Sequence, residues 1–463
     1  MGIFFCNFGL NFGWIQFYST TDITEGMSNT ILDKTIPAIS GIIFVSLLFF
    51  PPLRLSSSLP TVELIDLLLP VLGLIIFLKR KEIVQKKFIY LTLVFGFYIF
   101  LTISINGRLE ALRDYFEIFK ILKFASIIVL FSFVTPIHFM NKWIKPAFVV
   151  LVIINLIHYY NLFHINDFLD QYYTSGGRYT KFGLDSLGRP TYKRMLGLLG
   201  NPNDNAIMFM IFSIFFFPRK DSTKACYFWF GTAIIMMFLC QSRTAMVALV
   251  PMLLIHFFLI RKHRPIILTT LIVSVVCFIM AYSITKVSIN LGNRSSYVVE
   301  NDTVSDTIPT ADITYLGTVI SDDIVESQSI LGRYAVWEHL WGMIKEKPVF
   351  GYGPYKEYFY ERELYAENEY VLLTWRYGFI GVFIYLSLII YLLILSYKHH
   401  AKEYGHKLLL LTILIVVTGI TNVPFSHKTI LVLFAVAIGL FFSELRNEKK
   451  MLPSSKTKSN EEN

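Results

Sequence analysis

The sequence predicts an all-α, polytopic membrane protein: a bundle of about twelve transmembrane helices with two large loops on one side. Three observations support this fold class. Hydrophobic residues make up 54% of the 463 residues and charged residues only 16%, with a mean hydropathy of +0.54. Apolar stretches of roughly 20 residues, enough to span a bilayer, recur from Ile36 to Leu445. Lysines and arginines gather in every second connection between these stretches.

The composition excludes several other classes. A water-soluble chain of this composition would expose too much apolar surface. The net charge of +9 and pI near 9.1 do not indicate nucleic-acid binding, because the basic residues are scattered over short connections. The four cysteines lie in or beside apolar stretches without CxxC spacing, so neither a metal site nor a disulfide framework is expected.

Each apolar stretch predicts one helix. The predicted ranges are 36–53, 59–78, 88–105, 115–135, 144–163, 203–217, 225–240, 244–260, 265–284, 368–396, 408–424 and 428–445. We expect residues 27–445 to form one membrane domain. Residues 1–26 resemble an upstream extension, because their aromatic stretch lacks the basic start of a signal peptide and Met27 precedes a short polar run.

The basic connections fix the expected orientation. They contain Lys79-Arg80-Lys81, Lys142 with Lys145, Arg219-Lys220, Arg261 to Arg264, and Lys398 to Lys407. By the positive-inside rule these connections are cytoplasmic, as are both termini and the polar tail 446–463. The long loops 164–202 and 285–367 then lie outside, and loops of this length in a compact membrane protein are usually functional.

The first outer loop is rich in cations and ends at a helix cap. It contains Arg178, Lys181, Arg189, Lys193 and Arg194. Asn201 or Asn203 can cap the following helix, and Pro202 suits its first turn. The pattern fits either a substrate-binding loop or a solvated basic loop that leads into a helix.

Arginines at two further positions are candidates for binding an anion. Arg243 lies in a short turn between two apolar spans, where it either serves a site or extends to lipid headgroups. Arg333 precedes apolar residues at helical spacing up to Pro348, which predicts an amphipathic helix with Arg333 in its first turn. There the arginine and the free amides could hold an anion together, although an ordinary surface arginine gives the same pattern.

The end of the second loop contains a glycine turn and a polar helix entrance. Gly351-Tyr352-Gly353 resembles a channel filter, but a filter needs a preceding pore helix and fourfold repetition, so we expect a tight turn. Helical spacing predicts that Glu367, Tyr370 and Thr374 share one face and that Glu369 and Arg376 share another. The second pair is either functional or a structural ion pair.

These segments, in this order, resemble the O-antigen polymerase and ligase superfamily of bacterial membrane glycosyltransferases. The resemblance covers residues 189–390. It rests on the segments Gly200-Asn201-Pro202-Asn203, Ser242-Arg243-Thr244, Gly332-Arg333 with Trp337, Pro348 with Gly351 and Gly353, Glu367-Asn368-Glu369-Tyr370, and Tyr377-Gly378 with Gly381. Arg189 and Gly200 also follow the arginine-and-glycine spacing of polymerase loops, whereas the second loop lacks that spacing after Arg333.

The resemblance implies a GT-C-like enzyme in the bacterial inner membrane with its active site facing the periplasm. Its donor would be an oligosaccharide on undecaprenyl diphosphate, used without a metal or other cofactor. Membrane lipids and a chain-length regulator protein would be its other partners, with no role for nucleic acid. Arginine suits the diphosphate leaving group, because it binds oxyanions bidentately and stays charged.

The resemblance leads to specific roles. Glu367, Arg333 and Arg243 are expected to be catalytic, with Glu367 as general base toward the acceptor hydroxyl. The substrate-binding candidates are Arg178, Arg189, Arg194, Asn201, Asn203, Asn368, Tyr370 and Arg376. Ligases typically have histidine where this chain has Glu367, so a polymerase of lipopolysaccharide-type surface polysaccharide is favoured over an O-antigen ligase.

A transporter of lipid-linked sugars is the alternative from another class. It would also need cationic groups, but near the bilayer midplane on several helices, often with broken helices and internal repeats. Most candidates here lie in outer loops or at helix ends, which favours the enzyme.

Overall fold

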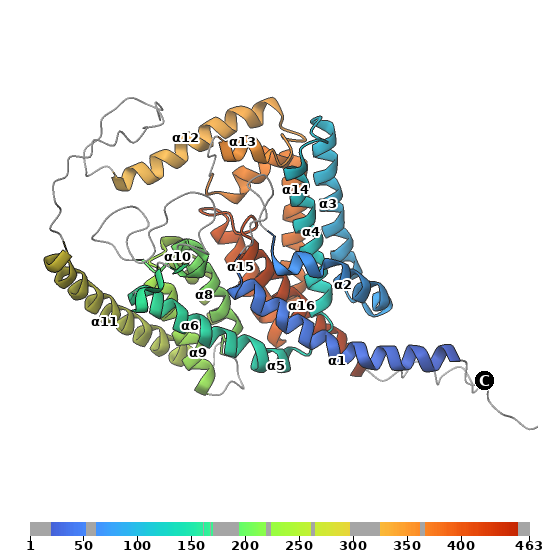
Figure 1. Cartoon of the computed structure of the whole chain (residues 1–463), viewed down its shortest axis with the longest axis horizontal. Helices are drawn as coiled ribbons and strands as arrows, with labels where there is room; N and C mark the ends of the chain where they lie inside the picture. Colours follow the sequence, from blue (N-terminus) through green and yellow to red (C-terminus); the bar gives the residue numbers. More distant parts are fainter. Residues whose placement is uncertain are drawn as a thin grey trace, which may run out of the picture.

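The computed structural model describes residues 20–51, 62–160, 162–166, 168–169, 194–218, 224–260, 264–296, 325–361 and 366–451. Over these ranges the chain is helical and contains no β-strand, which confirms the all-α prediction. Figure 1 shows a bundle with α12 and α13 lying across one end of it.

All twelve predicted apolar helices are present in the described part of the chain. Their bounds are α1 Thr20–Phe49, α2 Leu64–Leu78, α3 Lys86–Ile105, α4 Leu112–Phe131, α6 Lys145–Tyr160, α8 Pro202–Phe215, α9 Lys224–Leu239, α10 Arg243–Leu259, α11 Arg264–Ser296, α14 Glu369–Lys398, α15 Glu403–Thr418 and α16 Lys428–Met451. The short helix α5, Pro136–Phe139, continues through a π-helical turn, Met140–Ile144, into α6.

Two helices extend well past their predicted C-terminal ends. Helix α11 extends to Ser296, well past the expected end at residue 284. Helix α16 continues to Met451, six residues into the expected polar tail 446–463. Two further α-helices, α12 Val325–Glu346 and α13 Lys356–Glu361, lie within the long loop 285–367.

The helices have the composition of a membrane bundle. Four segments within the described residues are long and apolar enough to cross a bilayer: Lys86–Ile105, Pro136–Tyr160, Glu369–Lys398 and Lys428–Glu448. The others are shorter apolar helices. Large side chains such as Phe383 and Ile394 on α14 are 71% and 66% exposed, which suits a lipid-facing surface. The chain is therefore a multi-pass helical membrane protein.

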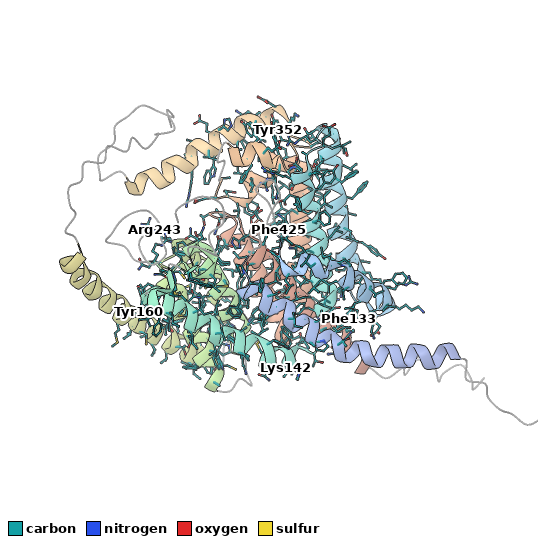
Figure 2. All side chains as sticks on the ribbon, in the orientation of Figure 1. Phe133, Lys142, Tyr160, Arg243, Tyr352 and Phe425 are labelled. Atoms are coloured by element: carbon teal, nitrogen blue, oxygen red, sulfur yellow. The ribbon has the colours of Figure 1, made fainter. Side chains whose placement is uncertain are left out.

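The two ends of the bundle differ in composition. Lys142, from a basic connection, lies at the opposite end from Tyr352, which belongs to the turn between α12 and α13 (Figure 2). The turn that contains Tyr352, one of the segments quoted for the resemblance, therefore lies away from this basic connection. We call the Tyr352 end the outer end.

Helix α14 is broken at Gly378, and the turn after α12 seals the break. Gly378 has a φ of 61°, a conformation that favours glycine. The Trp375 and Arg376 carbonyls accept hydrogen bonds from the Tyr352 and Gly353 amides, at 3.1 and 2.7 Å. In exchange, the Phe379 amide donates to the Pro348 carbonyl at 2.8 Å.

The break also explains the glycine turn. Gly351 and Gly353 have φ values of 66° and 75°, so the prediction of a tight turn is confirmed. A Cβ on Gly351 would lie 2.5 Å from the Arg376 carbonyl oxygen, and one on Gly378 would lie 2.2 Å from the Val349 carbonyl oxygen. The turn and the helix break need glycine because their backbones touch. Irregular backbone at membrane depth is tolerated when protein surrounds it in this way.

Candidate functional site

Helix α12 carries Arg333 across the outer end of the bundle, where it pairs with Glu367. The Arg333 guanidinium forms an ion pair with the Glu367 carboxylate, and their side chains are 29% and 42% exposed. The prediction that Arg333 lies in the first turn is wrong, because α12 already begins at Val325. No free helix amides therefore assist Arg333; its described partner is Glu367.

A small apolar core holds α12 against α14. Leu340 and Ile344 of α12 pack with Ala366, Leu372 and Trp375, and the Trp337 indole N–H donates to the Ala366 carbonyl at 2.5 Å. The predicted amphipathic helix thus lies on the bundle. This core places Arg333 opposite the residues that precede α14.

Glu367 lies just outside α14. Its φ is 43°, and the following residue, Asn368, is the N-cap, accepting hydrogen bonds from the Tyr370 and Val371 amides. The expectation that Glu367 shares a helical face with Tyr370 and Thr374 is therefore wrong for Glu367, because helical geometry starts only after Asn368. The Tyr370 hydroxyl donates to the Val416 carbonyl, which ties α14 to α15.

Glu369 and Arg376 do not form an ion pair. The Glu369 carboxylate, fully buried, accepts a hydrogen bond from the Phe425 amide at 2.9 Å. Arg376 stacks on the Phe359 ring of α13, with its guanidinium carbon 4.7 Å from the ring centre. Shared helical spacing placed them on one face, but their nearest partners come from two different elements.

The connection between α15 and α16, residues 419–427, joins three of the segments quoted for the resemblance. The Glu369 amide donates to the Gly419 and Asn422 carbonyls at 2.8 and 3.1 Å. The hydroxyls of Thr244 in α10 and Thr421 are 2.8 Å apart. This connection carries no motif of its own, so the sequence did not single it out.

The same connection also binds the start of α8. Asp204 accepts a hydrogen bond from the Asn422 side-chain amide at 3.3 Å and lies 3.4 Å from His427 Nε2. Asn201 caps α8 as predicted, accepting from the Asn203 amide at 2.8 Å. The starts of α8, α10 and α14 are thereby fixed around one short segment.

The remaining predicted cations occupy different environments. Arg194 donates to the Cys240 and Gln241 carbonyls and to Asn203 at 3.2–3.3 Å, so it links the start of α8 to the turn before α10. Arg243 is exposed at the first residue of α10 (Figure 2). Arg178 and Arg189 lie outside the described residues.

Sequence reasoning missed a buried ionic cluster on α4. We define the α4 cluster as Glu117, Lys120, Lys356 and Arg376. Glu117 pairs with Lys120 one turn away and with Lys356 Nζ of α13 at 2.8 Å. Arg376 is close enough for its charge to interact with both Glu117 and Lys120.

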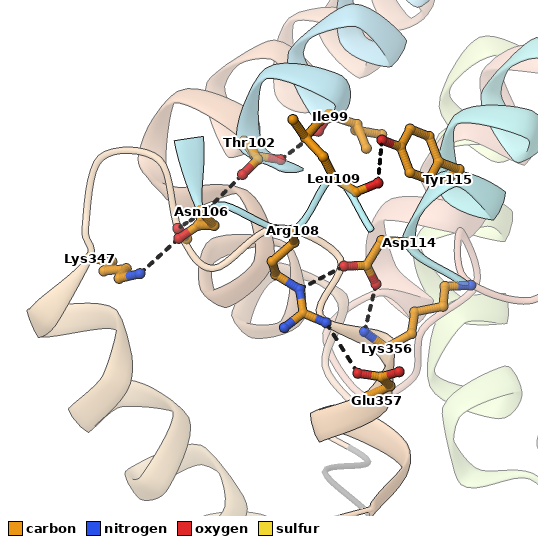
Figure 3. Close-up of polar contacts among 11 residues, drawn as sticks. Ile99, Thr102, Asn106, Arg108, Leu109, Asp114, Tyr115, Lys347, Lys356 and Glu357 are labelled. Atoms are coloured by element: carbon orange, nitrogen blue, oxygen red, sulfur yellow. Dashed lines mark hydrogen bonds and ion pairs between the residues drawn. The ribbon is translucent and has the colours of Figure 1, made fainter. Parts of the chain in front are cut away.

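A second set of charges holds the outer end of α4 and α13 together. Arg108 Nε is 2.8 Å from Asp114, whose other oxygen accepts the Lys356 amide at 2.9 Å (Figure 3). The Arg108 guanidinium also reaches Glu357 at 3.8 Å. These contacts fix the backbone of Lys356 while its side chain turns to Glu117.

A third set lies deeper and faces α2. Lys123 Nζ is 2.7 Å from both Glu63 and Asp66, and Lys428 Nζ is 3.7 Å from Glu63. The charged residues of α4 follow one another every three positions, Asp114, Glu117, Lys120 and Lys123. Three residues fall about 60° short of a full helical turn, so each of these side chains is rotated by that angle from the one before it. The four side chains therefore face different neighbouring helices. That spacing inside an apolar span was the available signal.

One tyrosine near the helix break is held protonated. The Tyr352 hydroxyl donates to Glu346 at 2.6 Å, and burial together with this carboxylate raises the pKa of Tyr352 well above its usual range. Tyr352 also stacks on Trp375. It therefore acts as a hydrogen-bond donor that fixes the turn.

The described residues contain no group of three or more His, Cys, Asp or Glu side chains arranged to hold a metal ion. The functional groups that the described outer end does offer are arginines, lysines, single carboxylates and backbone amides.

Comparison with known proteins gives one match. A family profile described as O-antigen ligase matches residues 228–386, from within α9 to the middle of α14. The matched range contains Arg243, Arg333 and the Glu367-Asn368 segment, whereas the Asn201-Pro202-Asn203 segment lies before it. No curated protein shows significant similarity to the chain. The match supports the O-antigen polymerase and ligase superfamily without separating its two activities.

Proposed function

We propose that this protein is a polymerase of a surface polysaccharide. It transfers an oligosaccharide from undecaprenyl diphosphate onto a second lipid-linked repeat unit at the periplasmic face of the inner membrane. The Arg333–Glu367 ion pair is the observation that carries the proposal. It joins two segments far apart in the sequence, and both belong to the range that matches the family profile.

The pair supplies the two groups that the reaction needs. The acceptor hydroxyl attacks the anomeric carbon of the donor sugar, the bond from that carbon to the diphosphate oxygen breaks, and the diphosphate leaves with its electron pair. Glu367 takes the hydroxyl proton, and Arg333 with Arg243 stabilises the charge that develops on the diphosphate.

An O-antigen ligase is the second candidate, because the matching family profile is described by that activity. The two reactions share donor and leaving group and differ in the acceptor, which is a lipid-linked repeat unit for a polymerase and the lipid A core for a ligase. Glu367 at the position of the typical ligase histidine favours the polymerase.

The helix break would favour a transporter only if its ends were free to bind a substrate. The carbonyls of Trp375, Arg376 and Tyr377 all accept protein donors, and the amides of Phe379 and Ile380 donate to the turn after α12. These groups are already occupied by protein. The break therefore does not favour a transporter over an enzyme.

Replacement of Glu367 by Gln tests the proposal. The variant keeps the shape of the side chain but cannot accept the proton, so polymer formation should fall by roughly 100-fold to 10,000-fold. Glu338→Gln is the matched control, since Glu338 is an exposed carboxylate on α12. Gel electrophoresis of surface and lipid-linked glycans from a complemented deletion strain measures both.

The pattern of products separates the candidates. Surface lipid carrying a single repeat unit indicates lost polymerisation, as proposed. Long chains trapped on the lipid carrier would instead assign the protein as a ligase, and normal ladders would exclude Glu367 as the base.

A further inference from the structure

The α4 cluster contains more positive than negative charge. Lys120, Lys356 and Arg376 surround one carboxylate, Glu117, which contacts both lysines. Glu369 also interacts electrostatically with this group, but its carboxylate is directed to the Phe425 amide. Lys120 and Lys356 therefore share one directly contacting carboxylate, and Arg376 lies near it without a direct ion pair.

Arg376 lacks the contacts that a buried guanidinium normally makes. Only 5% of the Arg376 surface is exposed, and among the described residues its Nε has no hydrogen-bond partner. No carboxylate of the described residues lies within ion-pair distance of it. A buried charge without compensating contacts is costly, and ionisable groups at membrane depth are functional candidates.

The set around Lys123 provides an internal contrast. There, Lys123 and Lys428 face Glu63 and Asp66, so two cations meet two carboxylates within 4 Å. Nothing in that set calls for a further anion. Of these two sets, the α4 cluster is the one with an excess of positive charge.

The α4 cluster lies at a depth that the headgroup of a lipid can reach. Lys120 is eight residues below the start of α4 and Arg376 seven below the start of α14, which corresponds to about 10–12 Å from the outer ends of these helices. Phe119 and Leu122, which flank Lys120 on α4, are 50% and 42% exposed, so this part of α4 borders the lipid. A lipid could thus present its phosphate to the cluster while its chains stay in the bilayer.

We infer that Lys120, Lys356 and Arg376 form a second anion site, which binds the diphosphate of a lipid-linked substrate. This inference rests on the proposed function, in which Arg333 and Arg243 bind the donor diphosphate. A polymerase uses two lipid-linked substrates, so the α4 site is assigned to the acceptor. The acceptor diphosphate is not cleaved; the site anchors it so that its terminal sugar reaches Glu367.

Binding of undecaprenyl diphosphate to the purified full-length protein tests the inference. The Arg243→Ala/Arg333→Ala double variant is the starting protein, so that only the α4 site is counted, and native mass spectrometry in detergent measures the bound lipid. We expect this protein to retain one lipid. Adding Arg376→Met should weaken binding by about tenfold or more, because one charge-assisted contact is lost.

Removal of the negative charge of Glu117 gives a second prediction, with the opposite effect on lipid binding. Glu117→Gln removes the carboxylate that competes for the cations, so lipid binding should be retained or tightened. If the cluster were only structural, Glu117→Gln and Arg376→Met would weaken binding together, and that result would overturn the inference. Lys347→Ala, an exposed cation at the same outer end, is the control and should change nothing. Thermal unfolding without lipid checks that each variant folds.

Two competitors identify the source of the diphosphate. Displacement by inorganic diphosphate at similar concentrations would show a site for the free anion, and displacement by phosphatidylglycerol would show a general lipid site; either would overturn the assignment to a polyprenyl substrate. Because this assay measures binding alone, it can fail while Glu367→Gln still abolishes polymer, and the reverse.

Discussion

Two ionic groups, one at the outer end of the molecule and one deeper in the bundle, differ in how firmly they are held. Arg333 and Glu367 form an isolated pair between α12 and the residue before the α14 cap, with side chains 29% and 42% exposed. Lys123, by contrast, is 10% exposed and is held by two carboxylates at the same distance of 2.7 Å. The first pair is open to water on both sides, whereas the cation of the second group is largely enclosed and its carboxylates, Glu63 and Asp66, are 18% and 29% exposed.

The difference in burial has an energetic meaning. An exposed ion pair contributes roughly 0–1 kcal/mol, so its members separate easily when another charge approaches. Breaking a buried pair leaves an uncompensated charge and costs roughly 3–5 kcal/mol. The Arg333–Glu367 pair is therefore suited to exchange partners with a substrate, whereas the Lys123 group is suited to hold α2 against α4.

The comparison requires Arg333 and Glu367 to lie at the non-cytoplasmic end of the bundle, where a periplasmic substrate can reach them. Reporter fusions after Gly176 and Ser305 should show both loops outside the cytoplasm, because the alternate connections contain the Lys and Arg clusters. Cytoplasmic reporter activity at either point would reverse the orientation and remove the periplasmic site.

The buried group should respond through stability. Lys123→Met leaves Glu63 and Asp66 without this cation, so we expect a loss of roughly 3–5 kcal/mol in the free energy of unfolding. Thermal unfolding of the purified protein in detergent measures it. Lys142→Met, at an exposed position of the opposite end, is the control and should leave the unfolding temperature nearly unchanged. Equal unfolding temperatures for the two variants would contradict the comparison.

The exposed group should respond through activity instead. Arg333→Ala and Arg243→Ala should each abolish polymer while protein levels stay near normal, since losing one contact to the developing charge raises the barrier by about 3–4 kcal/mol. Arg→Lys should rescue poorly, because lysine lacks the planar fork that binds two oxygens. Full-length chains in both Lys variants would rule out diphosphate binding by these arginines.

Much of the fold followed from hydropathy alone. Twelve apolar stretches gave twelve helices because a span of roughly 20 apolar residues has few alternatives in a bilayer. Local chemistry was also readable: Asn201 caps α8, and α12 ends at Glu346, just before Pro348. Such features depend on residues within a few positions of one another.

The site was harder to predict because its contacts are long-range. The start of α12 was placed too late, because the prediction began the helix at the apolar residues after Gly332, and so Arg333 was assigned to the wrong turn. Glu369 and Arg376 share a face by spacing, yet the residues that contact them, Phe425 and Phe359, lie in other elements. The charged residues of α4 lie within a predicted span. Their regular spacing of three residues was the sequence feature that could have indicated the buried ionic contacts.

At the break in α14, the backbone pairing depends more on the number of residues in the two segments than on which residues they are. Residues 348–353 contact residues 375–380 mainly through backbone amides and carbonyls, which every amino acid except proline offers alike. Apart from the glycines, side chains there can change without disturbing the pairing. One inserted or deleted residue would instead shift every amide by one position, and α13, which begins three residues after Gly353, would carry Lys356 away from Glu117.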